Sequence, residues 1–389
     1  MNDGRKICIL APRFPVPEIA GDAVRVNNIA KQLKRQGFTL VLVSFADTCH
    51  PDIEGAEKIY DKVLTVRHSK FSAYFHTLTA MFSGKPMQRG YYRSADFRKK
   101  LEEVVESEKP DLFLAHMTRM TSYLEDLHVE GKSIVEMSDA FSLKYRYSLQ
   151  TKGFSVMKLI SRIERKLIYR YERQVLENFP RVVLVSQADV DYLQKEFPYV
   201  RSLICRPNGV DCAGSVSKNY DCHKIVFIGN MRSLQNQDAV THFAEEILPK
   251  IKKEMPEAVF HVVGGDVPEK LERRLREVDF RGYIDNLGEE ISSACLTVAP
   301  MTIATGIQNK VLVSMANGVP VVISPRVAKG MPDFIDGTHG LVGETDEKFA
   351  ENCLRLMKDG DLRQKIGQNA YDLMKENYSW KKHLEHYVD

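Results

Sequence analysis

The chain has 389 residues, of which 43% are hydrophobic and 28% are charged, and its formal net charge is +3. These values are typical of a globular protein, and the small net charge gives no indication of nucleic-acid binding, so we expect no nucleic-acid partner. A chain of this length predicts two domains. The charge is uneven, because residues 1–205 contain 32 Lys and Arg against 25 Asp and Glu, whereas the remainder contains 23 against 27. We therefore expect the first half to meet an anionic partner.

The cysteine pattern favours a reducing compartment. The sequence has 7 cysteines and no CxxC pair, and several of them lie in apolar runs, which indicates small core residues rather than a disulfide framework. Cys222 and His223 lie near Cys212, but their spacing fits no common zinc pattern, so no metal site is predicted. The first residues lead into a strand without a signal peptide, and no apolar run approaches the roughly 20 residues of a membrane span. We expect a cytoplasmic protein.

The first half alternates short apolar strands with helices, which predicts a parallel, doubly wound sheet. A Pro-rich loop follows the first strand, and Asp22 is expected to cap the next helix, which Gly37 ends. In chain order we predict strand 7–11, helix 23–36, strands 38–45 and 62–66, helix 94–109, and strands 111–116, 133–137 and 182–185.

The segment 141–174 is predicted to be a long, basic helical stretch. Its Lys and Arg residues outnumber Glu164 and Glu172, and its apolar residues recur at helical spacing. One interpretation is the solvated face of a core helix. The other is a peripheral contact with an anionic membrane, because basic amphipathic helices are attracted to anionic lipid.

The second half repeats the alternation after a turn-rich linker at residues 205–218. We predict strand 224–229, helix 238–255, strand 258–264, helix 269–278, strand 280–283, helix 289–293, strand 296–299, and C-terminal helices 345–358 and 361–377. Two successive Rossmann-like domains are implied, with a ligand-binding cleft between them.

The stretch 306–322, GIQNKVLVSMANGVPVV, predicts a turn, a short helix and a buried strand. The start of a helix offers free backbone N–H groups and a partial positive charge, which suit an anion such as a diphosphate. Gly318 is expected to form the C-terminal cap of this helix. The dinucleotide motif GxGxxG and the Walker motif GxxxxGK[ST] are both absent, so a nicotinamide enzyme and a P-loop kinase are not expected.

Further segments of the sequence, in chain order, are LAPRFPVPEIAGDAVRVNNIAKQLKRQG, VEMSDAFSLKY, VLVSQADVDYLQ with PNGVD, VFIGNMRSLQNQDAVTHFAEEILPKIKKEMPEAVFHVVGG and NYSWKKHLEHY. Together with GIQNKVLVSMANGVPVV they resemble the retaining GT-B glycosyltransferases of the large family four class, and more narrowly the sugar transferases of bacterial polysaccharide and exopolysaccharide loci. The resemblance implies a GT-B fold, that is, two Rossmann-like α/β domains with doubly wound parallel sheets that face a cleft. It implies an acceptor-binding domain at 1–205, a nucleotide-sugar-binding domain at 206–375, and a final helix at 376–389 that crosses back to the first domain.

The resemblance also implies roles for residues of the first domain. Gly21 would lie near the donor phosphates, Asp22, Arg25 and Asp139 would lie on the acceptor side, and His116 would act near the donor sugar. Each has a simpler alternative. Gly21 would then be only a turn residue, Arg25 a surface residue, His116 a structural residue, and Asp139 the cap of the following helix.

In the second domain, the resemblance implies that Arg232, which follows GNM, and Lys310 are the two cations for the diphosphate. Arginine suits this task because its planar guanidinium pairs with phosphate oxygens. Many family members supply the lysine from a loop equivalent to 234–237, which has none here. The implied donor-binding residues of this domain are Gly229, Thr305, Gly306, Ile307, Gln308 and Asn309.

Two positions depart from the family pattern. Many members have a glutamate at the positions of Thr305 and Val313, the first touching the transferred sugar and the second holding the nucleotide ribose. The subgroup with a GIQNK segment often lacks the first glutamate. A valine cannot accept hydrogen bonds from ribose hydroxyls, so Val313 predicts weaker donor binding or a loss of catalysis.

The resemblance therefore implies a retaining, metal-independent glycosyltransferase that needs no cofactor and uses a nucleotide-diphosphate sugar as donor. Its acceptor would be a glycan or a lipid-linked glycan at the inner face of the cell membrane, in bacterial surface polysaccharide synthesis. Val313 and Thr305 motivate a second hypothesis, a non-catalytic GT-B scaffold protein in a polysaccharide assembly complex. A nucleotide-sugar epimerase is a third, but it requires a pair of acid–base carboxylates that the sequence does not identify.

Overall fold

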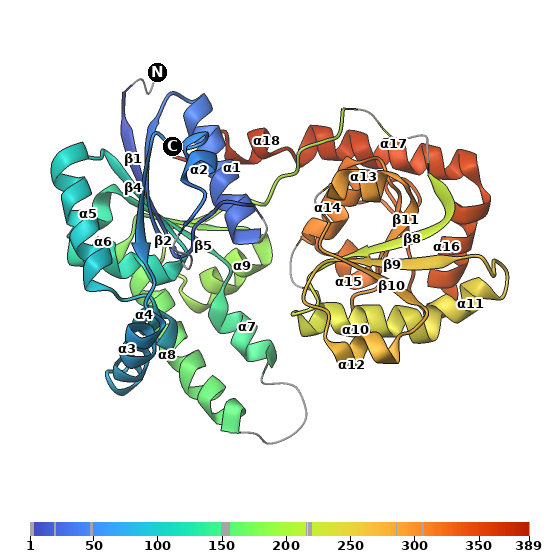
Figure 1. Ribbon diagram of the computed structural model, residues 1–389, viewed down its shortest axis with the longest axis horizontal. Helices are drawn as coiled ribbons and strands as arrows, with labels where there is room; N and C mark the ends of the chain where they lie inside the picture. Colours follow the sequence, from blue (N-terminus) through green and yellow to red (C-terminus); the bar gives the residue numbers. More distant parts are fainter. Residues whose placement is uncertain are drawn as a thin grey trace. The chain divides into compact units, whose positions relative to one another are not determined.

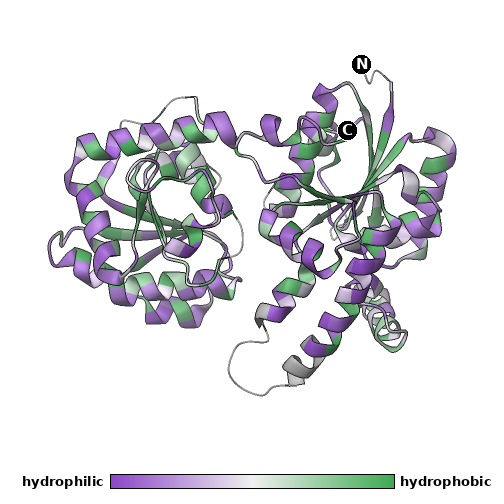
Figure 2. Cartoon of the chain, turned by 180° about the vertical axis from the view of Figure 1, so that it is seen from behind, coloured by the Kyte–Doolittle hydropathy of each residue, from purple (hydrophilic) through white to green (hydrophobic). Residues whose placement is uncertain are grey.

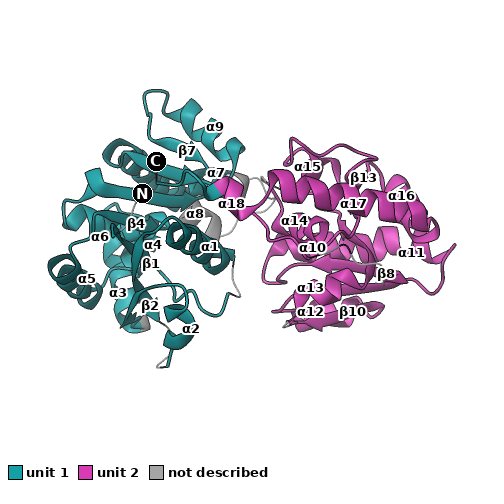
Figure 3. Cartoon of the chain, turned by 90° about the horizontal axis from the view of Figure 1, so that it is seen from above, with its two compact units in different colours: residues 1–207, 384–389 teal, residues 208–383 magenta. Residues whose placement is uncertain are grey.

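The computed structural model describes residues 4–18, 21–46, 50–148, 156–214, 216, 220–284, 286–304 and 307–388. The chain divides into two compact units (Figure 3), of which unit 1 is Met1–Pro207 with Leu384–Asp389 and unit 2 is Asn208–His383. The predicted domains end at residue 205 and the predicted crossing segment begins at 376. In the structure the chain returns to unit 1 only at Leu384, at the end of α18 (Trp380–Leu384).

Unit 1 contains a seven-stranded parallel sheet in the order β3-β2-β1-β4-β5-β6-β7 (Figure 1), which confirms the predicted doubly wound α/β class. The strands are β1 (Lys6–Ala11), β2 (Thr39–Ala46), β3 (Lys62–Arg67), β4 (Leu112–His116), β5 (Ser133–Ser138), β6 (Arg181–Leu184) and β7 (Leu203–Cys205). The helices are α1 (Gly21–Arg35), α2 (Ile53–Glu57), α3 (Lys70–Phe82), α4 (Met87–Tyr91), α5 (Ala95–Glu108), α6 (Thr121–Asp126), α7 (Phe141–Ser148), α8 (Val156–Asn178) and α9 (Gln187–Glu196).

Most differences from the sequence-based expectations in unit 1 concern helices. The segment 141–174, predicted as one helical stretch, forms the two helices α7 and α8, and residues 149–155 lie outside the described part of the chain. The helices α2, α3, α4, α6 and α9 and the edge strand β7 were not predicted. Strand β7 is short and half-buried, which leaves little periodicity for a sequence to show.

Unit 2 contains a six-stranded parallel sheet in the order β10-β9-β8-β11-β12-β13. The strands are β8 (Asp221–Ile228), β9 (Val259–Val263), β10 (Val278–Gly282), β11 (Ala294–Ala299), β12 (Val321–Ile323) and β13 (Leu341–Val342). The helices are α10 (Leu234–His242), α11 (Leu248–Lys252), α12 (Glu269–Arg274), α13 (Leu287–Ser292), α14 (Asn309–Ala316), α15 (Pro325–Ala328), α16 (Asp346–Lys358), α17 (Gly360–Asn377) and α18.

The predicted helix 238–255 is interrupted in the structure. A π-helical segment, Phe243–Ile247, separates α10 from α11, and Pro249 stands at the start of α11. Proline has no N–H to donate to the carbonyl four residues earlier, so a local change of hydrogen-bonding pattern accommodates it. By contrast, Gly318 is confirmed as the C-terminal cap of α14, since its φ is +69° and its N–H donates to the carbonyl of Met315 over 2.9 Å.

Both sheets are covered by helices on their two faces, so their central strands are mostly apolar (Figure 2). All six residues of β11 are buried, and five of the six residues of β1 are buried. In unit 1 the chain order reverses between β1 and β4, and in unit 2 it reverses between β8 and β11. Ligands of open α/β sheets bind at the carboxyl ends of the strands beside such a reversal, which places one candidate site in each unit.

A buried ion pair joins α1, the helix that follows β1, to strand β5. Arg25 on α1 donates from Nε and Nη2 to the two carboxylate oxygens of Glu136 on β5, each over 3.0 Å, and the side chains are 3% and 0% exposed. Tyr387 donates its hydroxyl to Glu136 over 2.6 Å. Burial by itself lowers the pKa of Arg25, but the Glu136 carboxylate outweighs burial and raises it. Arg25 therefore stays charged, and its buried charge requires the Glu136 carboxylate as a counter-charge.

The same network fastens the end of the chain to unit 1. Arg25 also donates to the carbonyls of Arg206 over 2.8 Å and Pro207 over 3.3 Å, at the end of the unit. Gln36 donates to the carbonyl of Glu385 over 2.5 Å, and Arg206 donates to the carbonyl of His386 over 3.0 Å. Hydrogen bonds thus hold the C-terminal residues and the end of unit 1 near the buried pair of Arg25 and Glu136.

We predict that Glu136→Gln lowers the free energy of unfolding by about 3–5 kcal/mol, because it leaves the Arg25 charge buried without a counter-charge. Urea unfolding followed by fluorescence and circular dichroism measures this change. The double variant Arg25→Met with Glu136→Leu removes both charges and is expected to recover most of the loss. A Glu136→Gln protein within about 1 kcal/mol of the wild type would contradict the central role of this pair.

Candidate functional site

The loop after β8 carries the predicted cation Arg232 at the reversal point of unit 2. Its guanidinium lies 2.9 Å from Asp266, whose other carboxylate oxygen accepts from Asn230 over 2.7 Å. Asp266 follows β9, so the two neighbouring strand ends are tied together. The Arg232 side chain is 80% exposed, and an ion pair this exposed contributes little to stability, so a phosphate can replace the aspartate. Asp266 was not predicted, although Gly264 and Gly265 mark the turn before it.

Glycines allow these two loops to approach each other closely. A Cβ on Gly264, whose φ is +146°, would lie 2.1 Å from the carbonyl oxygen of Gly229. A Cβ on Gly229 would lie 2.6 Å from Nδ2 of Asn236. A side chain at Gly229 would displace the Asn236 side chain of α10, and the donor-binding role of Gly229 stays a prediction.

Lys310, in the first turn of α14, is a buried cation held by neutral groups. Its Nζ donates to Oδ1 of Asn236 over 2.6 Å and lies 4.4 Å from the centre of the Phe227 ring. Asn236 in turn donates to the carbonyl of Asn230 over 2.8 Å. Among the residues that the structure describes, no carboxylate pairs with Lys310. Burial lowers the pKa of Lys310 to about 8, which means that an approaching anion would stabilise its charged form.

The start of α14 supplies the remaining predicted donor-binding residues. Gln308 occupies the N-cap position without a side-chain cap hydrogen bond, and Asn309 accepts a hydrogen bond from Asn208 over 3.1 Å. Ile307 is partly buried against the core of unit 2. Thr305 and Gly306 lie outside the described residues. The described part of this segment thus brings a helix start next to Lys310, as the sequence predicts.

Val313 lies one turn further along α14, where it packs partly buried against apolar side chains of unit 2. Its carbonyl accepts a hydrogen bond from Asn317 over 2.8 Å. This position therefore offers a ligand an apolar contact and no side-chain acceptor.

The reversal point of unit 1 holds His116 at the end of β4. The side chain is 2% exposed, and neither ring nitrogen has a hydrogen-bond partner among the described residues. Burial lowers the pKa of His116 to about 3, and the charges of Arg25 and Arg119 act in the same direction, whereas the Asp22 carboxylate opposes them. The imidazole is neutral near pH 7. A buried polar side chain with two unused nitrogens is unusual and points to a functional role.

Charged groups surround His116 on the neighbouring loops. Asp22, in the first turn of α1, lies 3.4 Å from the guanidinium of Arg13 in the loop after β1. Arg119, in the loop after β4, stacks over the ring of Tyr92 at 4.9 Å and donates to the sulfur of Met117 over 3.4 Å. Burial lowers the pKa of Arg119. Arg13 and Arg119 were not predicted, although they lie two and three residues, respectively, after the ends of the strands beside the reversal.

Two predicted residues of unit 1 have other surroundings than expected. Arg25 was assigned to the acceptor side, with a surface residue as the alternative, and it is neither, because its buried guanidinium is occupied by Glu136. Gly21 begins α1, and a Cβ there would meet no atom within 4 Å, so protein packing does not require glycine. Its predicted place near the donor phosphates stays a prediction.

Asp139 follows β5, as predicted, and its carboxylate accepts from Lys144 of α7 over 2.6 Å. Two further carboxyls hold this region. Glu172 of α8 accepts from the N–H of Ser142 over 3.0 Å, and burial raises its pKa to about 7. Burial, with the charge of Asp139 second, raises the pKa of Asp189 to about 6. These groups fix the start of α7 and were not identified from the sequence.

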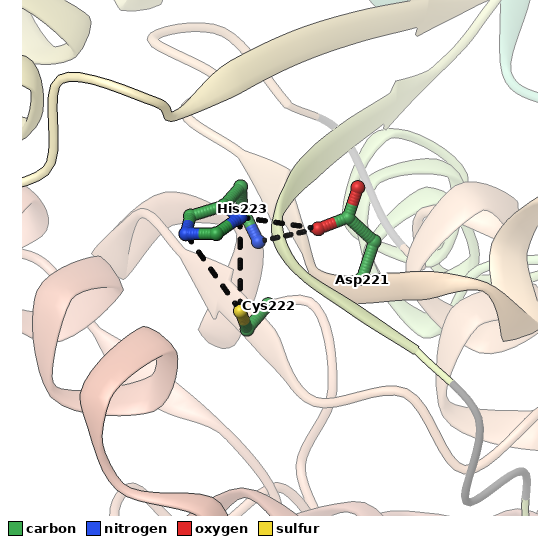
Figure 4. Close-up of side chains that lie close together, drawn as sticks. All are labelled: Asp221, Cys222 and His223. Atoms are coloured by element: carbon green, nitrogen blue, oxygen red, sulfur yellow. Dashed lines mark hydrogen bonds and ion pairs between the residues drawn. The ribbon is translucent and has the colours of Figure 1, made fainter.

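One group of potential metal ligands occurs in the described part of the chain, and it lies away from both sites (Figure 4). Asp221, Cys222 and His223 are consecutive at the start of β8, with 3.7 Å between the Cys222 sulfur and His223 Nδ1 and 3.5 Å between Nδ1 and Asp221. They lie at the amino end of the strand, whereas Arg232 follows its carboxyl end. Cys212 is not part of this group. Three adjacent side chains supply fewer ligands than a structural zinc site requires.

The structure describes no helix that combines the length and the apolarity that crossing a bilayer requires.

We predict that His116 makes the protein less stable in acid. A folded-state pKa of about 3 against 6.5 for a free histidine means that the unfolded chain binds the proton first, so stability is complete above about pH 6.5 and falls as pH decreases toward 3. Urea unfolding between about pH 4 and pH 7 should show up to about 1.4 kcal/mol per pH unit from this group. His116→Phe is expected to remove this contribution, and an unchanged pH dependence in that variant would contradict it.

Comparison with known proteins agrees with this arrangement. Residues 222–359 match the family described as glycosyl transferases group 1. A 44.6 kDa protein from the cps region of Klebsiella pneumoniae is 23% identical over 177 residues, which cover 42% of this chain and 45% of that protein. The chain spans less than half the length of the curated relatives that it matches.

Solved structures resemble the chain over nearly its whole length. Sucrose-phosphate synthase of Thermosynechococcus elongatus has a TM-score of 0.71 at 16% identity and covers 98% of this chain and 97% of its own. Anabaena HepE, in complex with UDP and glucose, has a TM-score of 0.68 at 14% identity and covers 99% and 98%. The chain therefore has the GT-B fold of glycosyltransferases, and its second unit matches the glycosyl transferases group 1 family.

Proposed function

We propose that the protein is a glycosyltransferase that moves a sugar from a nucleotide-diphosphate donor to an acceptor glycan. The observation that carries this proposal is Lys310, a buried cation at the reversal point of unit 2 that has no carboxylate partner among the described residues. It lies in the first turn of α14, so its charge adds to that of the helix start. Such an arrangement suits a diphosphate.

The proposed chemistry is mainly electrostatic. When the bond between the sugar and the diphosphate breaks, negative charge grows on the diphosphate, and preorganised cations lower the energy of that state. Lys310 and Arg232 would supply this charge, with Asp266 releasing Arg232 to the phosphate. These cations would take the part that a metal ion plays in other transferases, so we propose a metal-independent reaction in which EDTA leaves turnover unchanged. Retention of anomeric configuration is carried over from the family resemblance.

We propose a UDP-sugar as donor and a glycan or lipid-linked glycan as acceptor. HepE has been solved with UDP and with UDP-glucose, which supports the uridine nucleotide. The relative from a cps region and the positive balance of residues 1–205 support an anionic or lipid-linked acceptor in surface polysaccharide synthesis. His116, Asp22 and Arg119 would then contact the sugar and the acceptor. The protein would act at the inner face of the cell membrane.

A non-catalytic scaffold is the second candidate, and Val313 is the observation that favours it. An apolar side chain at the place where many family members hold the ribose removes a charged hydrogen bond, which is typically worth about 1.5–3 kcal/mol. This amount weakens donor binding without abolishing it, so transfer remains the preferred proposal.

A thermal-shift screen against UDP, GDP, ADP, dTDP and CMP distinguishes the two candidates. A ligand that binds only the folded protein raises the unfolding temperature, and we expect the uridine nucleotides to do so. A different responding nucleotide would correct the donor assignment. A cooperative unfolding transition that none of them shifts would favour the scaffold.

We predict that UDP affinity falls as pH rises through about 8, because Lys310 loses its proton there and the bound diphosphate needs the charge. Isothermal titration calorimetry in buffers of different ionisation enthalpy should detect proton uptake on binding near pH 8. Lys310→Met is expected to weaken binding about tenfold to a hundredfold and to remove the proton uptake. Wild-type affinity in Lys310→Met would contradict the assignment.

Arg232→Ala is the matched variant for this measurement. It is expected to abolish donor turnover and to weaken UDP binding while proton uptake is kept, because the arginine remains charged at all these pH values. Circular dichroism should show an unchanged fold, since Arg232 is exposed. Unchanged turnover would contradict its role as a diphosphate cation.

A further inference from the structure

Helix α3 (Lys70–Phe82) turns its large apolar side chains to solvent. Phe71, Tyr74, Phe75, Leu78 and Phe82 are 88%, 63%, 60%, 56% and 85% exposed, respectively. Their spacing of three and four residues places them on one side of the helix, which we call the α3 aromatic face. A globular protein rarely exposes so many large apolar groups together unless they bind something.

The packing of α3 fixes this orientation. Its other side carries Ala73 and Ala80, which are buried and lie against α4. A Cβ on Gly90 of α4 would lie 2.3 Å from the carbonyl oxygen of His76 and 2.6 Å from the Cβ of Ala80, so the two helices are in close contact. Only small residues fit this contact. The helix therefore buries alanine and exposes phenylalanine, the reverse of an ordinary surface helix.

The surroundings of the α3 aromatic face are positively charged. Between Asp61 and Asp96 the sequence contains six Lys or Arg and no Asp or Glu. Three of the six, Lys62, Arg89 and Arg93, form ion pairs with carboxylates from other parts of unit 1, so the remaining three and the side chains of α8 carry the positive charge. Helix α8 packs beside α4 (Figure 1), because buried Glu164 accepts from the N–H of Met87 over 2.9 Å. The exposed side chains Arg162, Lys166 and Arg170 of α8 have no ion-pair partner in the described part of the chain.

We propose that the α3 aromatic face inserts into the interfacial layer of an anionic lipid bilayer, with the basic side chains of α8 contacting the headgroups. A helix of 13 residues is roughly 20 Å long, so it lies in the plane of the interface. Positive charge beside apolar insertion matches an anionic membrane surface. It disfavours a second copy of this chain, because two such surfaces would bring like charges together. This inference goes beyond the transfer reaction and does not depend on it.

Vesicle co-sedimentation of the full chain tests the inference without donor or acceptor. The wild type is expected to bind vesicles of phosphatidylcholine with phosphatidylglycerol at least about tenfold more tightly than vesicles of phosphatidylcholine alone. Phe71→Ser with Phe82→Ser should lose about tenfold or more of that binding, since it removes two inserting side chains. Ile335→Ser, which changes an apolar side chain of unit 2 that is 58% exposed, is the matched control and should bind as the wild type does.

A second variant tests the role of the basic side chains of α8. Arg162→Gln with Lys166→Gln and Arg170→Gln should weaken binding to the anionic vesicles and reduce its dependence on salt, while binding to neutral vesicles is unchanged. The UDP thermal shift should persist in every variant, so a failure of membrane binding is distinguishable from a failure of the proposed function.

Three results would overturn the inference. The first is wild-type vesicle binding by the Phe71→Ser and Phe82→Ser variant, and the second is no binding of the wild type to either vesicle. The third is a concentration-dependent dimer in light scattering that this variant abolishes, which would make the α3 aromatic face an interface between copies.

Discussion

The geometry of unit 1 depends on one buried ion pair, that of Arg25 and Glu136. The pair joins α1 to β5, so it helps to place Asp22 in the first turn of that helix and β5 beside β4, whose last residue is His116. Tyr387 completes the network from the other end of the chain. A buried charge pair is a weak source of stability compared with apolar packing, but removing one partner leaves an uncompensated buried charge, which is strongly destabilising. The conformation around His116 therefore depends on the pair of Arg25 and Glu136, which is not itself part of the candidate site.

Each reversal point combines a cation paired with a carboxylate and a largely buried cation held by neutral groups. In unit 1, Arg25 is paired with Glu136 and Arg13 with Asp22. Arg119, by contrast, contacts the Tyr92 ring and the Met117 sulfur and forms no ion pair among the described residues. In unit 2 the buried cation Lys310 is held by an amide, a ring face and a sulfur, none of which carries a full negative charge. Burial without a counter-charge lowers the pKa of such a lysine and makes it a stronger attractor for an incoming anion. The folding of unit 2 thus tolerates an unfavourable charge that ligand binding would relieve.

Most strands and the end of α14 were predictable from the sequence because they are local, whereas the order of the strands in each sheet was not predicted and Asp22 lies inside α1 instead of capping it. Short apolar runs gave the strands, and Gly318 marked the end of α14. The sites were less predictable, since their partners lie far apart: Glu136 is 111 residues from Arg25, and Tyr387 is 251 residues from Glu136. The role of Arg25 was missed for this reason. Helix α3 was missed for another, because its aromatic residues face outward and its alanines inward, and hydrophobic periodicity is ordinarily interpreted the other way.

Val313 bears on the balance of binding energy in the proposed donor site of unit 2. The residue packs against apolar neighbours, so changing it alone to an acid would put a carboxylate into partly apolar surroundings. If the proposed function holds, the binding energy that the resemblance assigns to a glutamate on the ribose would have to come from the diphosphate, through Lys310, Arg232 and the start of α14. Diphosphates are common to all nucleotide sugars, whereas the ribose and base distinguish donors from one another. A site that obtains most of its binding energy from the diphosphate would discriminate less between nucleotides. Its selectivity among donors would then arise from contacts with the sugar and the acceptor.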